Sequence, residues 1–178
     1  AQDTTTTRTT TTSVATVAGR HLFYNNSHFD DLGLVGDPSV NANDDGAIAT
    51  DKVALQSGTM ATFANYSSYS RGINGIMVDI DRGDSGGPLT AADFDFRVGN
   101  TADPSTWAVA PTPNGFAVRT AAGVAGSDRV TFTWADGVIK NQWLQVTVKA
   151  NGNTGLATPD VHYWGHQFGE TGNNPGNS

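Results

Sequence analysis

The stretch DRGDSGGPLT, residues 81–90, carries residue types that could do chemistry. Ser85 has a glycine two residues away on each side, which is the spacing of a nucleophile elbow. Such a serine needs a base, an orienting acid, an oxyanion hole and a helix that follows directly. Gly86-Gly87-Pro88 begins no helix, and none of the four histidines lies in a sequence setting that marks a catalytic base. We therefore expect no catalytic residue, and interpret the stretch as a turn between two strands.

The same stretch contains Arg82-Gly83-Asp84-Ser85, which resembles an integrin-binding tetrapeptide. A match of four residues is frequent by chance. The glycine-proline turn explains these residues equally well.

A second candidate site is the sequence NANDDG. It places Asn41, Asn43, Asp45 and Gly46 at positions 1, 3, 5 and 6 of an EF-hand-type calcium loop. The bidentate carboxylate of position 12 is absent, because Lys52 stands there. The sequence thus carries half of a calcium motif.

Other carboxylates lie two residues apart on expected strands, where they share one face of the sheet. Calcium could bind among Asp79, Asp81 and Asp84, or the same residues could be solvated and form Asx turns. Asp93/Asp95 is a pair with the same spacing, and the adjacent residues Asp30/Asp31 are a further acidic pair. The histidines do not form a zinc set, since His162 and His166 are spaced for a helix and not for a strand.

Composition narrows the class of protein. The 178 residues have a net charge of −7 and include no cysteine, and all acidic residues but Glu170 are aspartates. A phosphate backbone would be repelled, so we expect no nucleic-acid partner. No apolar run approaches the ~20 residues of a membrane span. The first residues, Ala1-Gln2-Asp3, are interpreted as the mature start of a secreted protein after removal of a signal peptide.

Apolar residues alternate with polar ones along most of the chain, which indicates strands. The alternation covers residues 20–24, 76–81, 94–98, 116–119, 130–134, 144–148 and 161–163. Gly, Asn, Asp and Pro separate these runs, and only residues 44–55 could form a helical turn. The pattern predicts an all-β protein, an antiparallel β-sandwich of jelly-roll type with an extended N-terminal segment.

Two tryptophans are expected on the outer surface of the sandwich. If Leu144, Val146 and Val148 point inward, Trp143 points outward. If Val161 and Tyr163 point inward, Trp164 points outward with its neighbouring histidines. Outward tryptophans could stack on sugar rings or on a partner, or cover a sheet edge within the domain. Trp107 and Trp134 are assigned to the core or its margin.

The N-terminal residues form a threonine tract. We predict that they either form a flexible, O-glycosylated linker or an extended strand that joins another copy of the chain. The glycosylation candidates are Thr4, Thr5, Thr6, Thr7, Thr9, Thr10, Thr11 and Thr12, and the assembly residues are these together with Val14 and Val17. The expected organisation is an extension over 1–13, a jelly-roll domain over 14–171 and a polar tail over 172–178.

The segments RHLFYNNSHFD, SRGINGIMVDI, DFDFRVGN, GSDRVTFTWADG and NQWLQVTVKANGNTGLATPDV resemble a recurrent jelly-roll-like β module of secreted bacterial proteins. With its N-terminal extension the chain is also similar to protomers of pilus-like extracellular filaments. That resemblance implies insertion of each N-terminal segment into the jelly roll of the next subunit.

Two functions follow as hypotheses. The first is a non-catalytic structural subunit of a pilus-like extracellular filament, a homopolymer that assembles head-to-tail through its N-terminal segment. The alternative is a carbohydrate-binding module tethered by the Thr-rich linker, with Trp143 and Trp164 against a polysaccharide. No cofactor is required for either function, and calcium and covalent O-glycans are the candidate additions.

Overall fold

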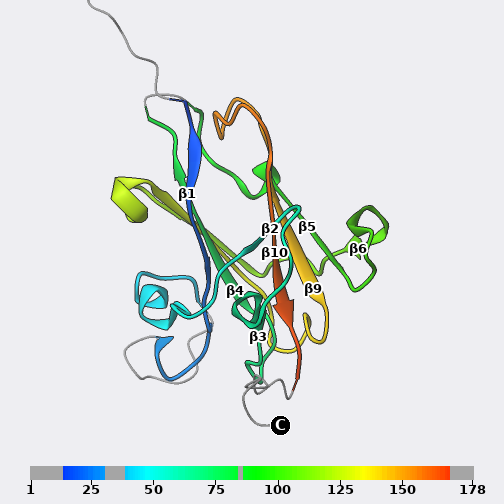
Figure 1. Cartoon of the computed structure of the whole chain (residues 1–178). Helices are drawn as coiled ribbons and strands as arrows, with labels where there is room; N and C mark the ends of the chain where they lie inside the picture. The colour runs from blue at the N-terminus through cyan, green and yellow to red at the C-terminus, as the bar shows by residue number, and fades with distance from the viewer. Residues whose placement is uncertain (1–13, 31–38, 84–85, 169–178) are drawn as a thin grey trace, which may run out of the picture.

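The structure is a computed structural model that describes residues 14–30, 39–83 and 86–168. It consists mainly of strands in two sheets, which pack face to face (Figure 1). In Figure 1, β1 and β4 lie in one layer, and β9 and β10 lie in the other.

One sheet has four antiparallel strands in the order β1-β4-β8-β7. These strands are β1 (Thr16–Leu22), β4 (Gly75–Asp81), β8 (Asp128–Thr133) and β7 (Gly115–Arg119). Strand β4 is buried on both faces as far as Ile80. Its Ile76 and Val78 belong to the main core, whereas Met77 packs on the opposite face against Phe23 and Ala47. The end of η2 (Asn43–Ala47) and the residue after it, Ile48, therefore cover part of the outer face of this sheet.

The other sheet has six strands, and its main path runs β2-β10-β9-β5-β6. These strands are β2 (Leu55–Gln56), β10 (Asp160–His166), β9 (Trp143–Val148), β5 (Phe94–Gly99) and β6 (Ala108–Val109). The short strand β3 (Tyr66–Ser67) pairs in parallel with the end of β10. The other pairings in this sheet are antiparallel.

The core between the sheets follows the period-two pattern of the sequence. Leu144, Val146 and Val148 of β9 are fully buried, and they alternate with partly exposed residues. Rings from both layers meet between the sheets: Phe132 has its centroid 4.9 Å from Phe94 and 4.8 Å from Phe96. Edge-to-face aromatic pairs of this kind add to the free energy gained from burial alone.

Short 3₁₀ helices form the connections. They are η2, η3 (Phe63–Asn65), η4 (Ala91–Asp93), η5 (Pro104–Thr106) and η6 (Val124–Gly126). Thr62 and Thr90 begin η3 and η4 with capping boxes, in which Asn65 and Asp93 accept from the threonine backbone amides. The helical turn expected within residues 44–55 is present as η2, and the chain is extended again at β2.

The expected all-β antiparallel sandwich is confirmed. Each of the alternating runs coincides with a strand to within a few residues, because the period-two pattern reflects one buried face per strand. The jelly-roll type remains a prediction. The N-terminal extension, residues 1–13, lies outside the described residues.

Candidate functional site

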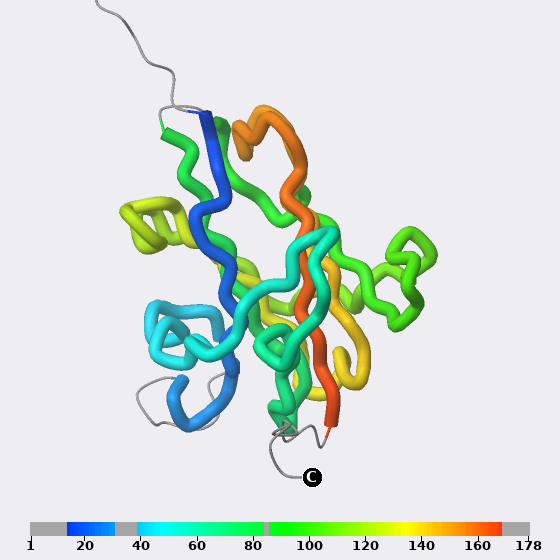
Figure 2. Tube along the Cα trace, viewed as in Figure 1, coloured from blue at the N-terminus to red at the C-terminus, as the bar shows by residue number. Residues whose placement is uncertain are grey.

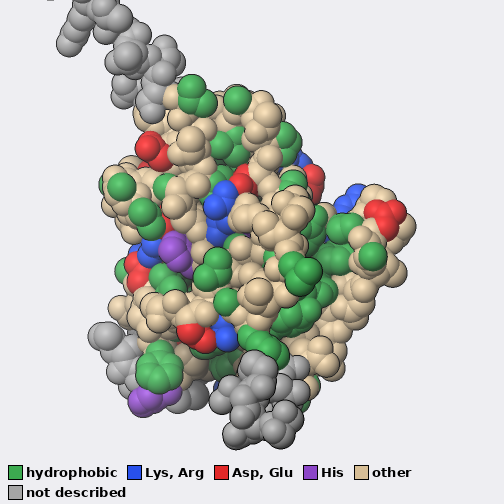
Figure 3. Space-filling view, viewed as in Figure 1, with side chains coloured by type: hydrophobic (Ala, Val, Ile, Leu, Met, Phe, Trp, Pro, Cys, Tyr) green, Lys and Arg blue, Asp and Glu red, His purple; other side chains and the backbone are tan. Residues whose placement is uncertain are grey.

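The outer face of the six-stranded sheet carries a hollow of about 550 Å³. Trp143 lies in it because the neighbouring Leu144 points into the core, so Trp143 faces outward as predicted. Residues 55–61 form one wall and the loop that contains η5 forms the other. Figure 3 shows hydrophobic side chains gathered between the body of the molecule and this loop. The aromatic lining residues are Tyr66, Trp107, Trp143 and Tyr163.

Two glycines leave space for these rings on the sheet. A Cβ atom on Gly165 would lie 2.5 Å from the ring of Tyr66. A Cβ atom on Gly99 would collide with the indole of Trp107 in the same way. Both glycines occupy outward positions, on β10 and β5. The rings of Tyr66 and Trp107 therefore lie directly on the backbone.

Hydrogen bonds hold the aromatic side chains in place. The indole Nε1 of Trp107 donates to the carbonyl oxygen of Thr101 at 3.0 Å. The side-chain amide of Gln145 donates to the hydroxyl of Tyr163 at 3.1 Å. The rings of Tyr66 and Trp143 meet edge to face, with centroids 4.5 Å apart. The site is thus built before any ligand arrives, which reduces the entropy lost on binding.

The lining of the hollow is aromatic and polar but carries no charge among the described residues. The polar lining residues include Gln56, Thr59, Asn100 and Thr101. Amides and hydroxyls both donate and accept hydrogen bonds. Such a surface suits a ligand with flat C–H faces and neutral hydroxyl groups.

The predicted outward position of Trp164 is wrong. Its side chain is fully buried in the main core, and His162 is fully buried beside it on the same face of β10. Val161 and Tyr163 are the outward residues instead, because the large indole gains more from burial than the valine does. Trp164 therefore offers no surface for stacking. Tyr163 occupies the outward position that was predicted for Trp164.

The sequence interpretation missed Tyr66 and Tyr163 as site residues and assigned Trp107 to the core or its margin. Trp107 is indeed only 7% exposed, yet its remaining surface lines the hollow. The outward glycines of β5 and β10 were the available signal.

The predicted calcium loop has a different structure. Asn43 begins η2, and its backbone amide donates to the side-chain oxygen of Asn41 at 2.6 Å. Asp45 forms ion pairs with Arg119 and, at 2.9 Å, with Arg129. A carboxylate neutralised by two guanidinium groups is a poor ligand for a cation.

Asp79 is occupied in the same way. Arg129 donates to both of its oxygens, at 2.7 and 2.8 Å, and His21 lies 2.9 Å away. Burial opposes ionisation, but these hydrogen bonds outweigh it and hold the pKa of Asp79 well below its usual value. Asp81 accepts from the backbone of Gly83, which forms an Asx turn. Asp84 lies outside the described residues.

Arg82 anchors the described residues on both sides of positions 84–85. Its guanidinium pairs with Asp128 and donates to the carbonyl oxygens of Gly87 and Asn153. An arginine held in this way presents little of its side chain to a receptor, since 18% is exposed. Ser85 lies outside the described residues.

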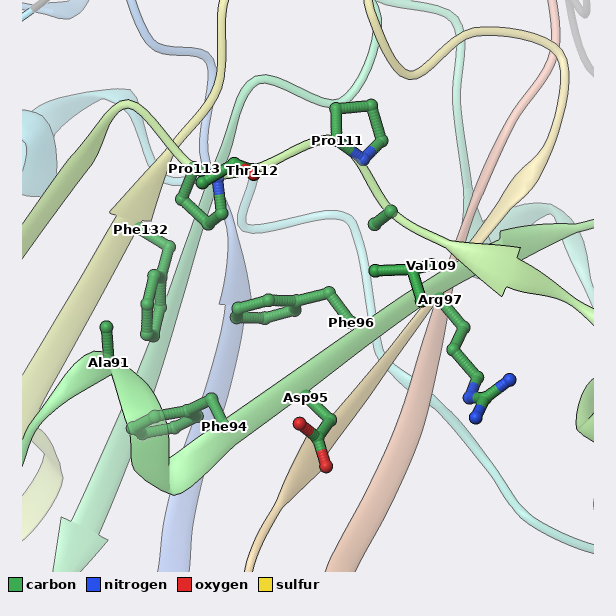
Figure 4. Close-up of a pocket in the computed structure, with 11 residues that line it drawn as sticks. Ala91, Phe94, Asp95, Phe96, Arg97, Val109, Pro111, Thr112, Pro113 and Phe132 are labelled. Carbon is green, nitrogen blue, oxygen red and sulfur yellow. The ribbon is translucent and has the colours of Figure 1, made fainter.

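A second hollow of about 420 Å³ opens beside β5. Phe94, Phe96 and Phe132 point toward one another around it, whereas Asp95 and Arg97 point away (Figure 4). Pro111 and Pro113 lie on its other side. The hollow gives access to rings of the core.

Comparisons of the chain with protein families, curated proteins and solved structures find no match. Within the described residues, no helix has the length and apolar character that would cross a membrane.

Proposed function

We propose that this protein is a non-catalytic carbohydrate-binding module of the extracellular space. The observation that supports it is the uncharged hollow around Trp143. The ligand class that fits this surface is a neutral polysaccharide. An enzymatic function would instead require hydrolase activity that is lost in Ser85→Ala.

The recognition follows from the chemistry of a sugar ring. A pyranose has flat faces of C–H groups, which pack on aromatic rings, and its hydroxyl groups project from the rim. Trp143 and Tyr163 would provide the stacking surface, and Gln56 and Asn100 would bind the hydroxyls. A pocket with a few well-placed polar groups among apolar ones is typical of a small-ligand site.

The test is binding of a panel of neutral and charged polysaccharides, by affinity electrophoresis and by calorimetry. Trp143→Ala is expected to weaken binding by at least about tenfold, since loss of a central aromatic contact typically costs ~2 kcal/mol or more. Phe168→Ala is the matched control, because Phe168 is an exposed aromatic residue outside the hollow. Equal binding by Trp143→Ala and the wild type would refute the proposal.

We infer a second candidate function from the hollow beside β5, namely a subunit of a pilus-like filament. Strand β6 pairs only with Arg97 and Val98 of β5. On that edge, the first residues of β5 have no paired strand in the described structure. Val17 was predicted to be an assembly residue, but it pairs with Ile80 within the chain's own sheet, as part of β1. Only the part of the predicted segment that precedes β1, from Thr4 to Val14, would therefore add to a neighbouring copy as an extended strand. Head-to-tail insertion of this kind propagates as an open filament.

Electron microscopy distinguishes the two functions. Deletion of residues 1–13 is expected to abolish filaments, whereas deletion of residues 172–178 serves as the control. Filaments that persist after the first deletion would contradict strand insertion. Intact-mass spectrometry of the secreted protein detects O-glycans on the threonine tract. A glycosylated monomer that binds polysaccharide through Trp143 would favour the first proposal.

A further inference from the structure

Two carboxylates lie buried beneath the four-stranded sheet, away from both hollows. Asp30 is 1% exposed and lies in the loop that follows β1, and Asp44 is fully buried in η2. Figure 2 shows this loop beside η2, and the amide of Tyr24 donates to the carbonyl oxygen of Ala47 at 3.0 Å. The two segments also meet at Gly46, where a Cβ atom would lie 3.1 Å from the carbonyl oxygen of Phe29.

Each carboxylate is only half satisfied. The Oδ2 atom of Asp30 accepts from the amide of Asn26 at 2.5 Å, and that of Asp44 accepts from the amide of Asn41 at 3.2 Å. The Oδ1 atoms of Asp30 and Asp44 are buried without a hydrogen-bond partner among the described residues. Buried polar atoms almost always have a partner, so these two oxygens must be satisfied either by a bound ligand or by a proton that Asp44 shares with Asp30.

A third unpartnered oxygen lies in the same loop. The side chain of Asn25 is almost fully buried, and its Oδ1 atom has no partner in the described part of the chain. The loop contains two successive turns. The backbone amide of Ser27 donates to the carbonyl oxygen of Tyr24, and the backbone amide of Asp30 donates to that of Ser27. The hydroxyl of Tyr69 donates to the carbonyl oxygen of Asn25 at 3.2 Å.

The same phenol, which bonds to the backbone of Asn25, is influenced by the charge of Asp30. Burial raises the pKa of Tyr69, and the negative charges of Asp136 and Asp30 raise it further.

The amide nitrogens of the neighbouring asparagines are directed elsewhere. The Nδ2 atoms of Asn26 and Asn74 donate to Asp136, at 3.3 and 2.8 Å. An amide oxygen points away from the partner of its nitrogen. The Oδ1 atoms of both side chains are buried and unpartnered in the described structure. This part of the molecule thus presents several oxygens and few donors.

No cation side chain in the described structure forms a direct ion pair with these charges, although Arg119, which pairs with Asp45, acts on Asp44 at longer range. Within the described residues, Asp30 and Asp44 form no ion pair at the distances that hold Asp45 and Asp79. Burial raises the pKa of Asp44 to about 7, and the neighbouring Asp30 contributes to the increase. Two adjacent carboxylates without a counterion are costly to bury.

We propose that Asp30, Asp44 and the side-chain oxygen of Asn25 bind a calcium ion. An oxygen-only set of two carboxylates and an amide suits a hard cation, whereas zinc and copper favour nitrogen and sulfur ligands. Calcium tolerates irregular arrangements better than magnesium does, and this fits ligands from an irregular loop and a 3₁₀ helix. The ion would fasten the loop to η2 and so secure the cover of the sheet.

Terbium luminescence and thermal unfolding test the site on the full chain. Tb³⁺ is a luminescent substitute for calcium, and Tyr69 and Tyr24, whose centroids are 4.7 Å apart, would sensitise it. The chelator-treated wild type is expected to give Tb³⁺ emission that calcium displaces. Its Tm is expected to rise by roughly 5–10 °C when free calcium is about a hundredfold above Kd.

Asp44→Asn and Asp30→Asn are expected to lose the calcium-dependent part of the Tm and most of the emission. Asp51→Asn is the control, since Asp51 is exposed. If the variants fail to fold, the wild-type titration alone decides. A folded wild type without a calcium-dependent Tm shift or Tb³⁺ emission at millimolar calcium would overturn the proposal. An Asp44→Asn protein as stable as the calcium-treated wild type would also overturn it, in favour of a protonated carboxyl pair.

Discussion

At the scale of single residues, the candidate sugar site depends on two glycines, which have no side chain, as much as on its aromatic residues. The rings of Tyr66 and Trp107 lie where the outward side chains of Gly165 and Gly99 would stand. Neither glycine has a positive φ, so the backbone itself would accept alanine. The requirement for glycine at these two positions is therefore one of space for the ring.

Gly165→Ala is expected to displace the Tyr66 ring and to weaken sugar binding by about tenfold, with a loss of stability of ~1–3 kcal/mol from overpacking. Calorimetry and urea unfolding measure the two effects. Gly152→Ala is the matched control, because a Cβ atom at Gly152 meets no atom within 4 Å. Unchanged affinity in Gly165→Ala would show that Tyr66 is not part of the binding surface.

At the scale of elements, β9 and β10 show what the sequence can predict. In β9 the inward residues are all aliphatic, so alternation alone places Trp143 outward, as found. In β10 both faces carry large aromatic or polar residues, and alternation leaves the direction open. The neighbours of β10 decide it, because Trp164 packs in the core and His162 bonds to Asp160 at 2.8 Å. Such a choice depends on contacts between strands distant in sequence.

The buried carboxylates illustrate the same limit. The sequence directs attention to Asp45 through its motif spacing, yet Asp45 binds two arginines from β7 and β8. Asp44, one residue earlier, faces Asp30 from the loop after β1. Only the folded chain shows which of two adjacent aspartates has a counterion.

At the scale of the whole molecule, a polar group connects the two sheets. Arg20 of β1 forms an ion pair with Asp160 of β10, and Asp160 also accepts from His162. The described part of the chain gives the Nε2 atom of His162 no partner, so protonation would leave a buried charge without a hydrogen bond. Burial consequently lowers the pKa of His162, although Asp160 opposes the shift.

The lowered pKa of His162 predicts a loss of stability in mild acid. Below the unfolded-state pKa of ~6.5, His162 binds a proton in the unfolded chain but stays neutral in the folded protein. The free energy of unfolding therefore decreases as the pH is lowered, until the pH reaches the folded-state pKa. The slope for one such group approaches about 1.4 kcal/mol per pH unit. Asp44, with a pKa raised to about 7, acts with the opposite sign in the absence of a bound cation. The contribution of His162 is therefore the difference in the free energy of unfolding between the wild type and a His162 variant, because both proteins retain Asp44.

His162→Gln keeps a donor for Asp160 and removes the titration. Urea unfolding is measured between about pH 7.5 and 5.5. As the pH decreases, the free energy of unfolding of the wild type is expected to fall relative to that of the variant. His28→Gln is the control, since His28 is an exposed histidine outside the core. Parallel stability curves for the wild type and His162→Gln would mean that His162 has the same pKa in the folded and unfolded chains. The bond from His162 to Asp160 would then compensate fully for the burial of the ring.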